Sequence, residues 1–121
     1  MRTIIAGTRT ITDYSKLELA IQDSGFSITT VLCGGSRGVD ALGEQYALAN
    51  DIPIEYYYAN WDAHGNAAGP IRNTEMANNA EALILVWDGV SRGSSDMLQK
   101  ATTKGLKIFT YIIKQEEPHE R

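Results

Sequence analysis

Five short apolar runs, each followed by a polar or glycine-rich stretch, dominate the pattern of the chain. Most of these runs are rich in β-branched residues and lack regular polar alternation, which is typical of strands covered on both faces. The predicted strands are residues 2–6, 28–32, 53–58, 82–86 and 107–113. The stretches between them carry apolar residues at helical spacing. Strands that alternate with helices predict a single three-layer α/β domain with about five parallel strands and helices on both faces.

Helix start and stop signals place the predicted helices between these strands. Asp13 is an N-cap residue ahead of the first helical stripe, and Gly25 follows its end. Pro70 stands at the favoured first position of a later helix, and Gly105 ends the last one. Residues 59–69 are small, polar and aromatic, so we predict an irregular connection there instead of a helix or strand. Connections of this length are often functional.

The length and composition predict one domain, residues 1–113, followed by a charged C-terminal tail, residues 114–121. No apolar run is long enough to span a membrane, and the N-terminus has the pattern of a strand instead of a signal peptide. Cys33 is the only cysteine, so no intrachain disulfide forms, and we expect a reducing cytoplasmic location. The formal net charge of −4 argues against a general binder of nucleic-acid backbones, which needs a basic face.

Two similar segments, residues 33–40 and 87–96, each follow a predicted strand. Both place Ser-Arg-Gly in the turn and an Asp shortly after it, at the start of a helical pattern. A third turn, Gly7-Thr8-Arg9, ends the first strand. Glycine permits close approach to the backbone, and a helix N-terminus offers unpaired N–H groups and partial positive charge. A strand, a glycine-rich turn and a helix start together therefore favour a phosphate site.

The carboxyl ends of parallel strands lie at one edge of the sheet, where ligands of such folds bind. We therefore predict that the three turns hold one phosphate-bearing ligand, because arginine suits phosphate. The alternative is that they are ordinary tight turns between strand and helix. The predicted ligand-binding residues of these turns are Gly7, Thr8, Arg9, Gly34, Gly35, Ser36, Arg37, Gly38, Asp40, Asp88, Ser91, Arg92, Gly93 and Ser94.

Two side chains are candidates for catalysis as well as binding. Arg72, on the helix before the fourth strand, would clamp a phosphate bidentately; its alternative is a surface ion pair with Asp62 or Glu75. Asp96 would orient a ribose hydroxyl or act as a general base. Its alternative is an acid that stabilises the N-terminal turn of its helix, and Asp40 has the same two interpretations.

The predicted irregular connection adds an aromatic residue and a histidine. Trp61 would stack on a base, and His64 would hydrogen-bond a phosphate or a base edge; alternatively, Trp61 anchors the connection by packing. Asn73, beside Arg72, completes the predicted binding residues. His64 and His119 stand alone, and no cluster of ligands has metal spacing, so we predict neither a metal nor a cofactor.

Several motifs in order along the chain resemble the YspA-like branch of the SLOG superfamily. They are Gly7-Thr8-Arg9, residues 34–40, residues 61–65, residues 68–73 with Met76, and residues 93–97. The similarity runs from about Arg2 to Ile113. It implies a Rossmann-like domain that binds a nucleotide or a nucleotide-derived, ADP-ribose-like signal as a sensor, sponge or effector. It also implies a homo-oligomer.

The same superfamily contains the LOG phosphoribohydrolases and the DNA-processing protein, which supply two alternative functions. As a nucleoside 5′-monophosphate phosphoribohydrolase or other N-glycosidic hydrolase, the chain would use Arg72 and Asp96. It departs from the LOG pattern, because Asn73 replaces a Lys and Met97 occupies the position of the catalytic Glu. Asp96 lies one residue earlier, which turns its side chain by about 100° on a helix. The second alternative is single-stranded DNA binding, which the acidic balance disfavours.

Overall fold

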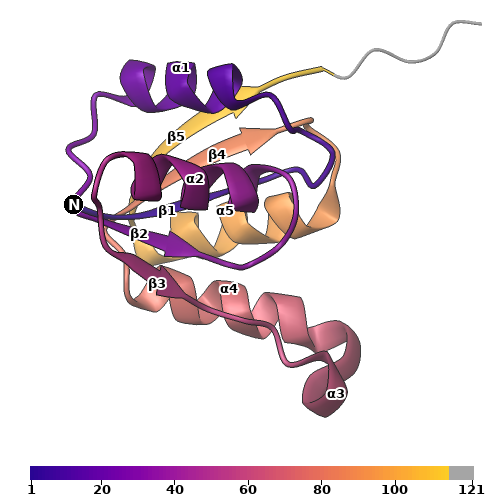
Figure 1. Cartoon of the computed structure of the whole chain (residues 1–121). Coiled ribbons are helices and arrows are strands. Elements are labelled where there is room, and N and C mark those ends of the chain that lie inside the picture. The colour runs from indigo at the N-terminus through magenta and orange to yellow at the C-terminus, as the bar shows by residue number, and fades with distance from the viewer. Residues whose placement is uncertain (115–121) are drawn as a thin grey trace, which may run out of the picture.

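The computed structural model describes residues 1–114, so the predicted tail falls outside the described residues except for Lys114. Strands and helices alternate along the chain (Figure 1). The strands are β1 (Arg2–Gly7), β2 (Thr30–Cys33), β3 (Ile54–Tyr56), β4 (Ala82–Trp87) and β5 (Lys107–Ile112). The helices are α1 (Tyr14–Ser24), α2 (Val39–Ala49), α3 (Trp61–His64), the 3-10 helix η1 (Gly65–Ala67), α4 (Ala68–Asn78) and α5 (Arg92–Lys104).

The strands form one parallel sheet in the order β3-β2-β1-β4-β5. The chain starts at the central strand β1, builds outward through β2 and β3, and then returns to the other side of β1 with β4 and β5. The direction of strand addition therefore reverses between β1 and β4. The connections after these two strands leave in opposite directions, which opens a crevice at the carboxyl edge of the sheet.

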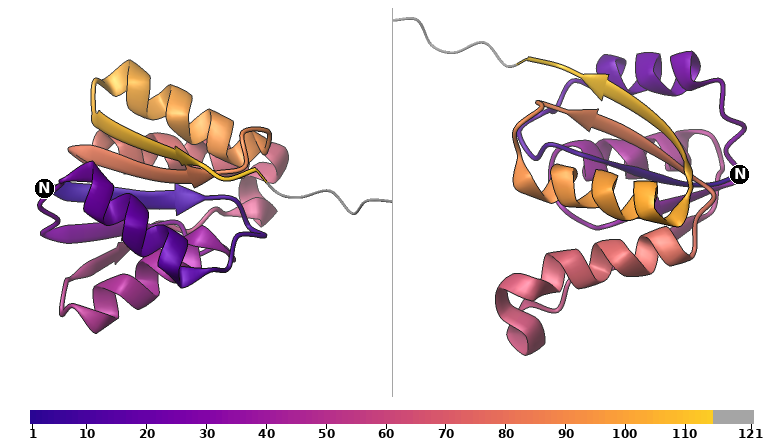
Figure 2. Two further views of the ribbon diagram at one scale, coloured as in Figure 1. Left: turned by 90° about the horizontal axis from the view of Figure 1, so that it is seen from above. Right: turned by 180° about the vertical axis from the view of Figure 1, so that it is seen from behind.

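Helices cover both faces of the sheet, as Figure 2 shows. On one face α1 and α2 pack against Ile5 and Ile84, and on the other α4 and α5 pack against Ile4 and Leu83. All four of these strand side chains are fully buried. Successive residues of one strand point to opposite faces, so a strand with a core on each side needs apolar residues at both. This confirms the predicted Rossmann-like three-layer α/β fold.

The prediction of an irregular connection over residues 59–69 is wrong. The segment contains α3, η1 and the first residues of α4. The side chain of Asn60 caps α3 by accepting a hydrogen bond from the backbone N–H of Ala63 at 3.1 Å, and Gly65, with φ of 54°, ends it. Pro70 is the third residue of α4 instead of the first. This position tolerates proline, because the first N–H groups of a helix have no partner inside it.

Candidate functional site

A cavity of about 290 Å³ opens at the carboxyl edge, where β1 and β4 lie side by side. Its volume is just below the range of about 300–1,000 Å³ that is typical of small-molecule sites. Residues from the turns after β1, β2 and β4 and from α4 share its wall. Of the predicted site residues, those that line it are Gly7, Thr8, Arg9, Ser36, Asp40, Arg72, Asn73, Asp88, Ser91, Gly93 and Ser94.

Two glycines allow the three turns to meet. Gly38 has a φ of 71°, and a Cβ at this position would come closer than 3.0 Å to the carbonyl oxygens of Thr8 and Arg9. A Cβ on Gly7 would likewise collide with the carbonyl oxygen of Val86. The turn after β1 therefore lies directly against both the turn after β2 and the end of β4. Only glycine permits such close contact between backbones.

Thr8 ties the turn after β1 to the turn after β4. Its side chain is buried, and its Oγ1 accepts a hydrogen bond from the backbone N–H of Asp88 at 3.0 Å. The same oxygen shares a hydrogen bond of 3.2 Å with the hydroxyl of Ser91. The backbone N–H of Thr8 donates to the carbonyl of Val86 at 3.1 Å. These bonds give the floor of the cavity a defined geometry.

The N-terminus of α5 faces the cavity through Gly93 and Ser94. Ser91 is the N-cap residue, but its side chain does not cap the helix and instead bonds to the hydroxyls of Thr8 and Ser94. The backbone N–H groups of residues 92–94 have no hydrogen-bond acceptor among residues 1–114. An uncapped helix start that opens into a cavity favours an anion.

Asp88 shapes the turn before this helix. Its Oδ1 accepts hydrogen bonds of 2.9 Å from the backbone N–H groups of both Val90 and Ser91. Partial burial opposes ionisation, but these N–H groups prevail and lower the pKa of Asp88 below its ordinary value. The carboxylate is therefore directed at its own turn, although Asp88 contributes to the wall of the cavity.

Arg72 reaches the cavity from the first half of α4. Its Nη1 donates to the carbonyl oxygen of Gly34 at 2.7 Å and more weakly to that of Tyr57 at 3.5 Å, and its Nε donates to Oδ1 of Asn73 at 3.0 Å. Within residues 1–114 Arg72 forms no salt bridge, so the alternative ion pair with Asp62 or Glu75 is absent there. The guanidinium is half-buried, and its Nη2 has no hydrogen-bond partner in the same range.

Asp40 places a buried carboxyl group in the cavity wall. The residue is 6% exposed, and its Oδ2 accepts a hydrogen bond of 3.2 Å from the backbone N–H of Ser36. Burial raises the pKa of Asp40, while that N–H and the charges of Arg72 and Arg9 act in the opposite direction. A Cβ on Gly34 would lie 2.8 Å from the carboxylate of Asp40 and 2.6 Å from Nη1 of Arg72, so Gly34 makes room for both groups.

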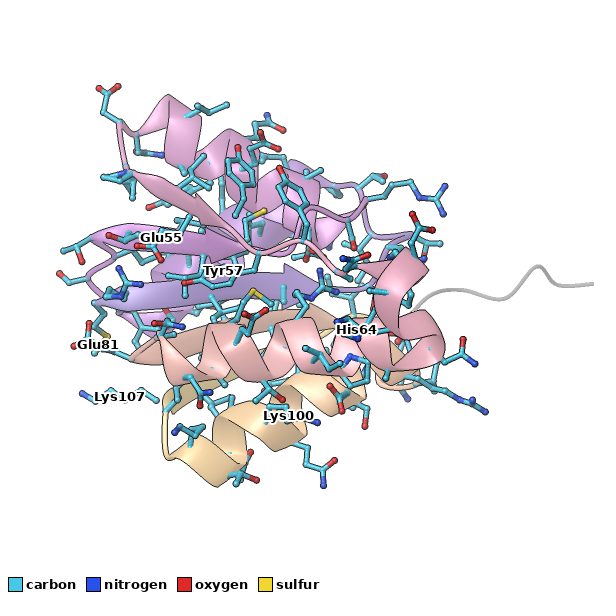
Figure 3. The ribbon with its side chains drawn as sticks, turned by 90° about the horizontal axis from the view of Figure 1, so that it is seen from below. Glu55, Tyr57, His64, Glu81, Lys100 and Lys107 are labelled. Carbon is cyan, nitrogen blue, oxygen red and sulfur yellow. The ribbon has the colours of Figure 1, made fainter. Side chains whose placement is uncertain are left out.

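Asp96 and Asn73 form a polar contact between α5 and α4. The carboxylate of Asp96 accepts hydrogen bonds of 2.9 Å from Nδ2 of Asn73 and 2.8 Å from Nζ of Lys100, the residue labelled on α5 in Figure 3. Asn73 also donates to the carbonyl of Gly93 at 3.4 Å and is 5% exposed. Asp96 does not line the cavity, whereas the next residue, Met97, does.

The remaining predicted residues lie outside the cavity lining. Gly34, Gly35 and Gly38 shape the turn after β2, and the side chains of Arg37 and Arg92 are exposed. Trp61 and His64 are exposed on α3, which projects at the carboxyl edge of the sheet (Figures 1 and 3). With 51% exposure, Trp61 lines a separate shallow hollow beside Tyr58 and Asn60.

The cavity is also lined by residues that were not predicted from the sequence to bind the ligand, namely Ala6, Thr10, Met76 and Met97. A signal for two of them was present. Met76 is four residues after Arg72 and Met97 four after Gly93, and residues at this spacing lie on one helix face. Within residues 1–114 no group of three or more His, Cys, Asp or Glu side chains is arranged to hold a metal ion. None of the helices in that range has the length and apolar character needed to cross a membrane.

The strand order, the reversal at β1 and β4 and the cavity at that point define a Rossmann-like α/β domain with a ligand-sized site at its switch point. The model of the YspA, cpYpsA-related SLOG family matches residues 1–64, and the chain belongs to this family. This confirms the resemblance to SLOG proteins.

Two similar proteins extend the comparison. The Gene 61 protein of Mycobacterium phage D29 is 27% identical over an alignment of 120 residues. The match covers 91% of this chain and 95% of that protein. The X-ray structure of DNA processing protein A (DprA) from Streptococcus pneumoniae matches with a TM-score of 0.71 at 16% identity. The match covers 90% of this chain and 49% of the DprA chain, so this chain spans about half of that protein. The likeness to DprA shows a shared fold.

Proposed function

We propose that the protein binds a nucleotide or a nucleotide-derived small molecule, with its phosphate at the N-terminus of α5. The observation that carries the proposal is the uncapped start of α5, which opens into a cavity that Arg9 and Arg72 also line. Backbone N–H groups, a helix dipole and two guanidinium groups at one site together favour a phosphate. Family membership supports the same ligand class.

The proposed phosphate oxygens accept hydrogen bonds from the backbone N–H groups of Gly93 and Ser94. Nη2 of Arg72 and the exposed guanidinium of Arg9 neutralise the charge. Hydrogen bonds with ionised partners are about twice as strong as neutral ones. The cavity has room for the phosphate and the sugar, and the open edge of the sheet leaves space for a base or a second ribose, as in an ADP-ribose-like ligand.

We favour binding as sensor, sponge or effector over hydrolysis. A hydrolase of the LOG type would need an acid at the position of Met97, which brings a thioether to the cavity wall. The carboxylate of Asp96 is bonded to Asn73 and Lys100 instead. Binding of single-stranded DNA is the weaker candidate, because the net charge of −4 opposes it.

Isothermal titration calorimetry with AMP, ADP-ribose, NAD and inorganic phosphate tests the proposal. We expect micromolar binding of at least one nucleotide by the unaltered chain. Arg9→Ala should weaken it about 10- to 100-fold, the size expected for a lost hydrogen bond to a charged group. Arg37→Ala is the matched control, since it removes an arginine that is also exposed, from the neighbouring turn outside the cavity, and should leave affinity within about twofold.

Absence of heat with all four compounds, at protein concentrations that detect micromolar binding, would overturn the proposal. So would equal weakening by Arg9→Ala and Arg37→Ala. A labelled single-stranded oligonucleotide provides the third arm. Salt-dependent binding of the oligonucleotide without nucleotide binding would replace this proposal by DNA binding.

A further inference from the structure

The carboxyl group of Asp40 has an unusual environment for an acid. It is 6% exposed and belongs to no salt bridge within residues 1–114. Ser36 satisfies only Oδ2, and Oδ1 has no hydrogen bond to any residue in this range. No side-chain oxygen or nitrogen of the described residues is both fully buried and unpaired. Oδ1 of Asp40 therefore retains some accessible surface, and the cavity is the space that this residue lines.

The position of Asp40 in the first turn of α2 and its bond to Ser36 account for only part of this group's environment. Burying a carboxylate with one hydrogen bond is unfavourable, and burial indeed raises the pKa of Asp40. Nor does Asp40 cap α2, whose N-cap residue Gly38 has no side-chain cap. A residue that holds a cavity-facing carboxylate at such a cost suggests an interaction with a ligand.

The chemistry of the cavity limits what this ligand group is. Direct contact between a phosphate oxygen and the carboxylate of Asp40 is disfavoured, because two anions repel each other. The anion-binding end lies at α5, which follows β4, whereas Asp40 follows β2, and β1 separates these strands. Two strand spacings correspond to roughly 10 Å. The ligand therefore presents its phosphate at one end and a hydrogen-bond donor at the other.

We propose that Asp40 accepts hydrogen bonds from ribose hydroxyls of the ligand and makes the site selective for ribonucleotides over 2′-deoxyribonucleotides. This rests on the proposed function and adds the identity of the sugar. A hydroxyl is neutral, donates to a carboxylate, and lies within one sugar of a 5′-phosphate. A site built around a buried acceptor discriminates against an analogue without the donor, since the acceptor is then left unpaired.

The test compares two matched pairs of ligands by calorimetry: AMP with 2′-deoxy-AMP, and ribose 5-phosphate with 2-deoxyribose 5-phosphate. The second pair removes any contribution of the base. We expect the unaltered chain to bind each ribo compound about 10- to 100-fold more tightly, as one hydrogen bond to a charged group predicts. Asp40→Asn keeps an oxygen to accept from Ser36 and should reduce this ratio to within about threefold.

Glu44→Gln is the matched control. It makes the same acid-to-amide change one turn later on α2, outside the cavity, and keeps an acceptor for the hydroxyl of Tyr56. The ratio should not change in this variant. If Asp40 had a purely structural role, Asp40→Asn would weaken the binding of ribo and deoxy ligands alike and leave the ratio of their affinities unchanged.

The outcomes separate the two proposals. Equal affinity for ribo and deoxy compounds in the unaltered chain, or a ratio that survives Asp40→Asn, overturns the role of Asp40 and leaves nucleotide binding intact. Failure of every compound to bind overturns the proposed function and the ribose assignment with it.

Discussion

Gly38→Ala probes the contact on which the whole site depends. Gly38 has φ of 71° and ψ of −129°, a conformation that side chains other than glycine adopt only under strain. Such strain costs about 1–3 kcal/mol. The new methyl group would also meet the carbonyl oxygens of Thr8 and Arg9, and overpacking adds about 1–3 kcal/mol. We therefore expect the free energy of unfolding to fall by about 4 kcal/mol, the middle of the summed range.

Gly25→Ala separates strain from contact. Gly25 also has positive φ, 68°, but nothing lies within 4 Å of a Cβ built there. This variant should lose only the cost of a left-handed residue, about 1–2 kcal/mol. Urea unfolding measures both variants, provided that the m-values agree with that of the unaltered chain. If Gly38→Ala costs no more than Gly25→Ala, the turns after β1 and β2 are not in close contact, and the argument for a shared cavity fails.

Two further predictions concern pH. Burial raises the pKa of Asp40, so the stability of the folded chain falls as pH rises from the unfolded pKa of about 3.9 through the higher folded pKa. Urea unfolding should therefore show Asp40→Asn to be more stable than the unaltered chain at pH 7 but not at pH 3, and equal stability at pH 7 contradicts this. Hydrogen bonds from Arg2 lower the pKa of Glu55 (labelled in Figure 3) to about 2, so this pair stabilises the fold above the ordinary pKa and is lost as pH falls from there to about 2. Because the side chain of Glu55 is 41% exposed, Glu55→Gln should lower the free energy of unfolding at pH 7 by no more than about 1 kcal/mol. Thermal unfolding should give the variant and the unaltered chain the same midpoint near pH 2.

The sequence allowed the fold to be predicted because each strand carries its own signal. In β4 all residues from Ala82 to Val86 are buried, and such an uninterrupted apolar run indicates a strand with helices on both sides. The order of the strands has no comparable local signal. It arises from which strand pairs with β1, and the apolar runs that become β2 and β4 are similar enough that pattern alone does not assign them to one side or the other.

The short helix α3 could not be predicted for a different reason. Trp61–His64 is a single turn without a buried residue, so it has no apolar stripe that would reveal helical spacing. Its formation depends on the cap from Asn60 and the stop at Gly65. Both residues also fit an irregular loop, which is why the composition of the segment was misleading.

The sequence likewise did not allow us to predict which arginines face the cavity. Arg9, Arg37 and Arg92 all lie within two residues of a glycine and shortly after a strand, yet of these three only Arg9 lines the cavity. Residue type does not distinguish them. The direction of each side chain follows from backbone geometry, such as the positive φ of Gly38 next to Arg37, and that geometry is set by contacts between turns far apart in the chain.

The most important difference from the hydrolase pattern is which residue of α5 faces the cavity. Because Met97 lines the cavity and Asp96 bonds to α4, α5 itself brings no carboxylate to the cavity wall. The free acid of the cavity comes from α2 instead, on the far side of β1. Asp88, the acid of the cavity wall nearest this helix start, directs its carboxylate at the backbone N–H groups of Val90 and Ser91. In the proposed nucleotide complex, Asp40 would therefore accept from a neutral hydroxyl of the ligand, while the phosphate would lie toward α5.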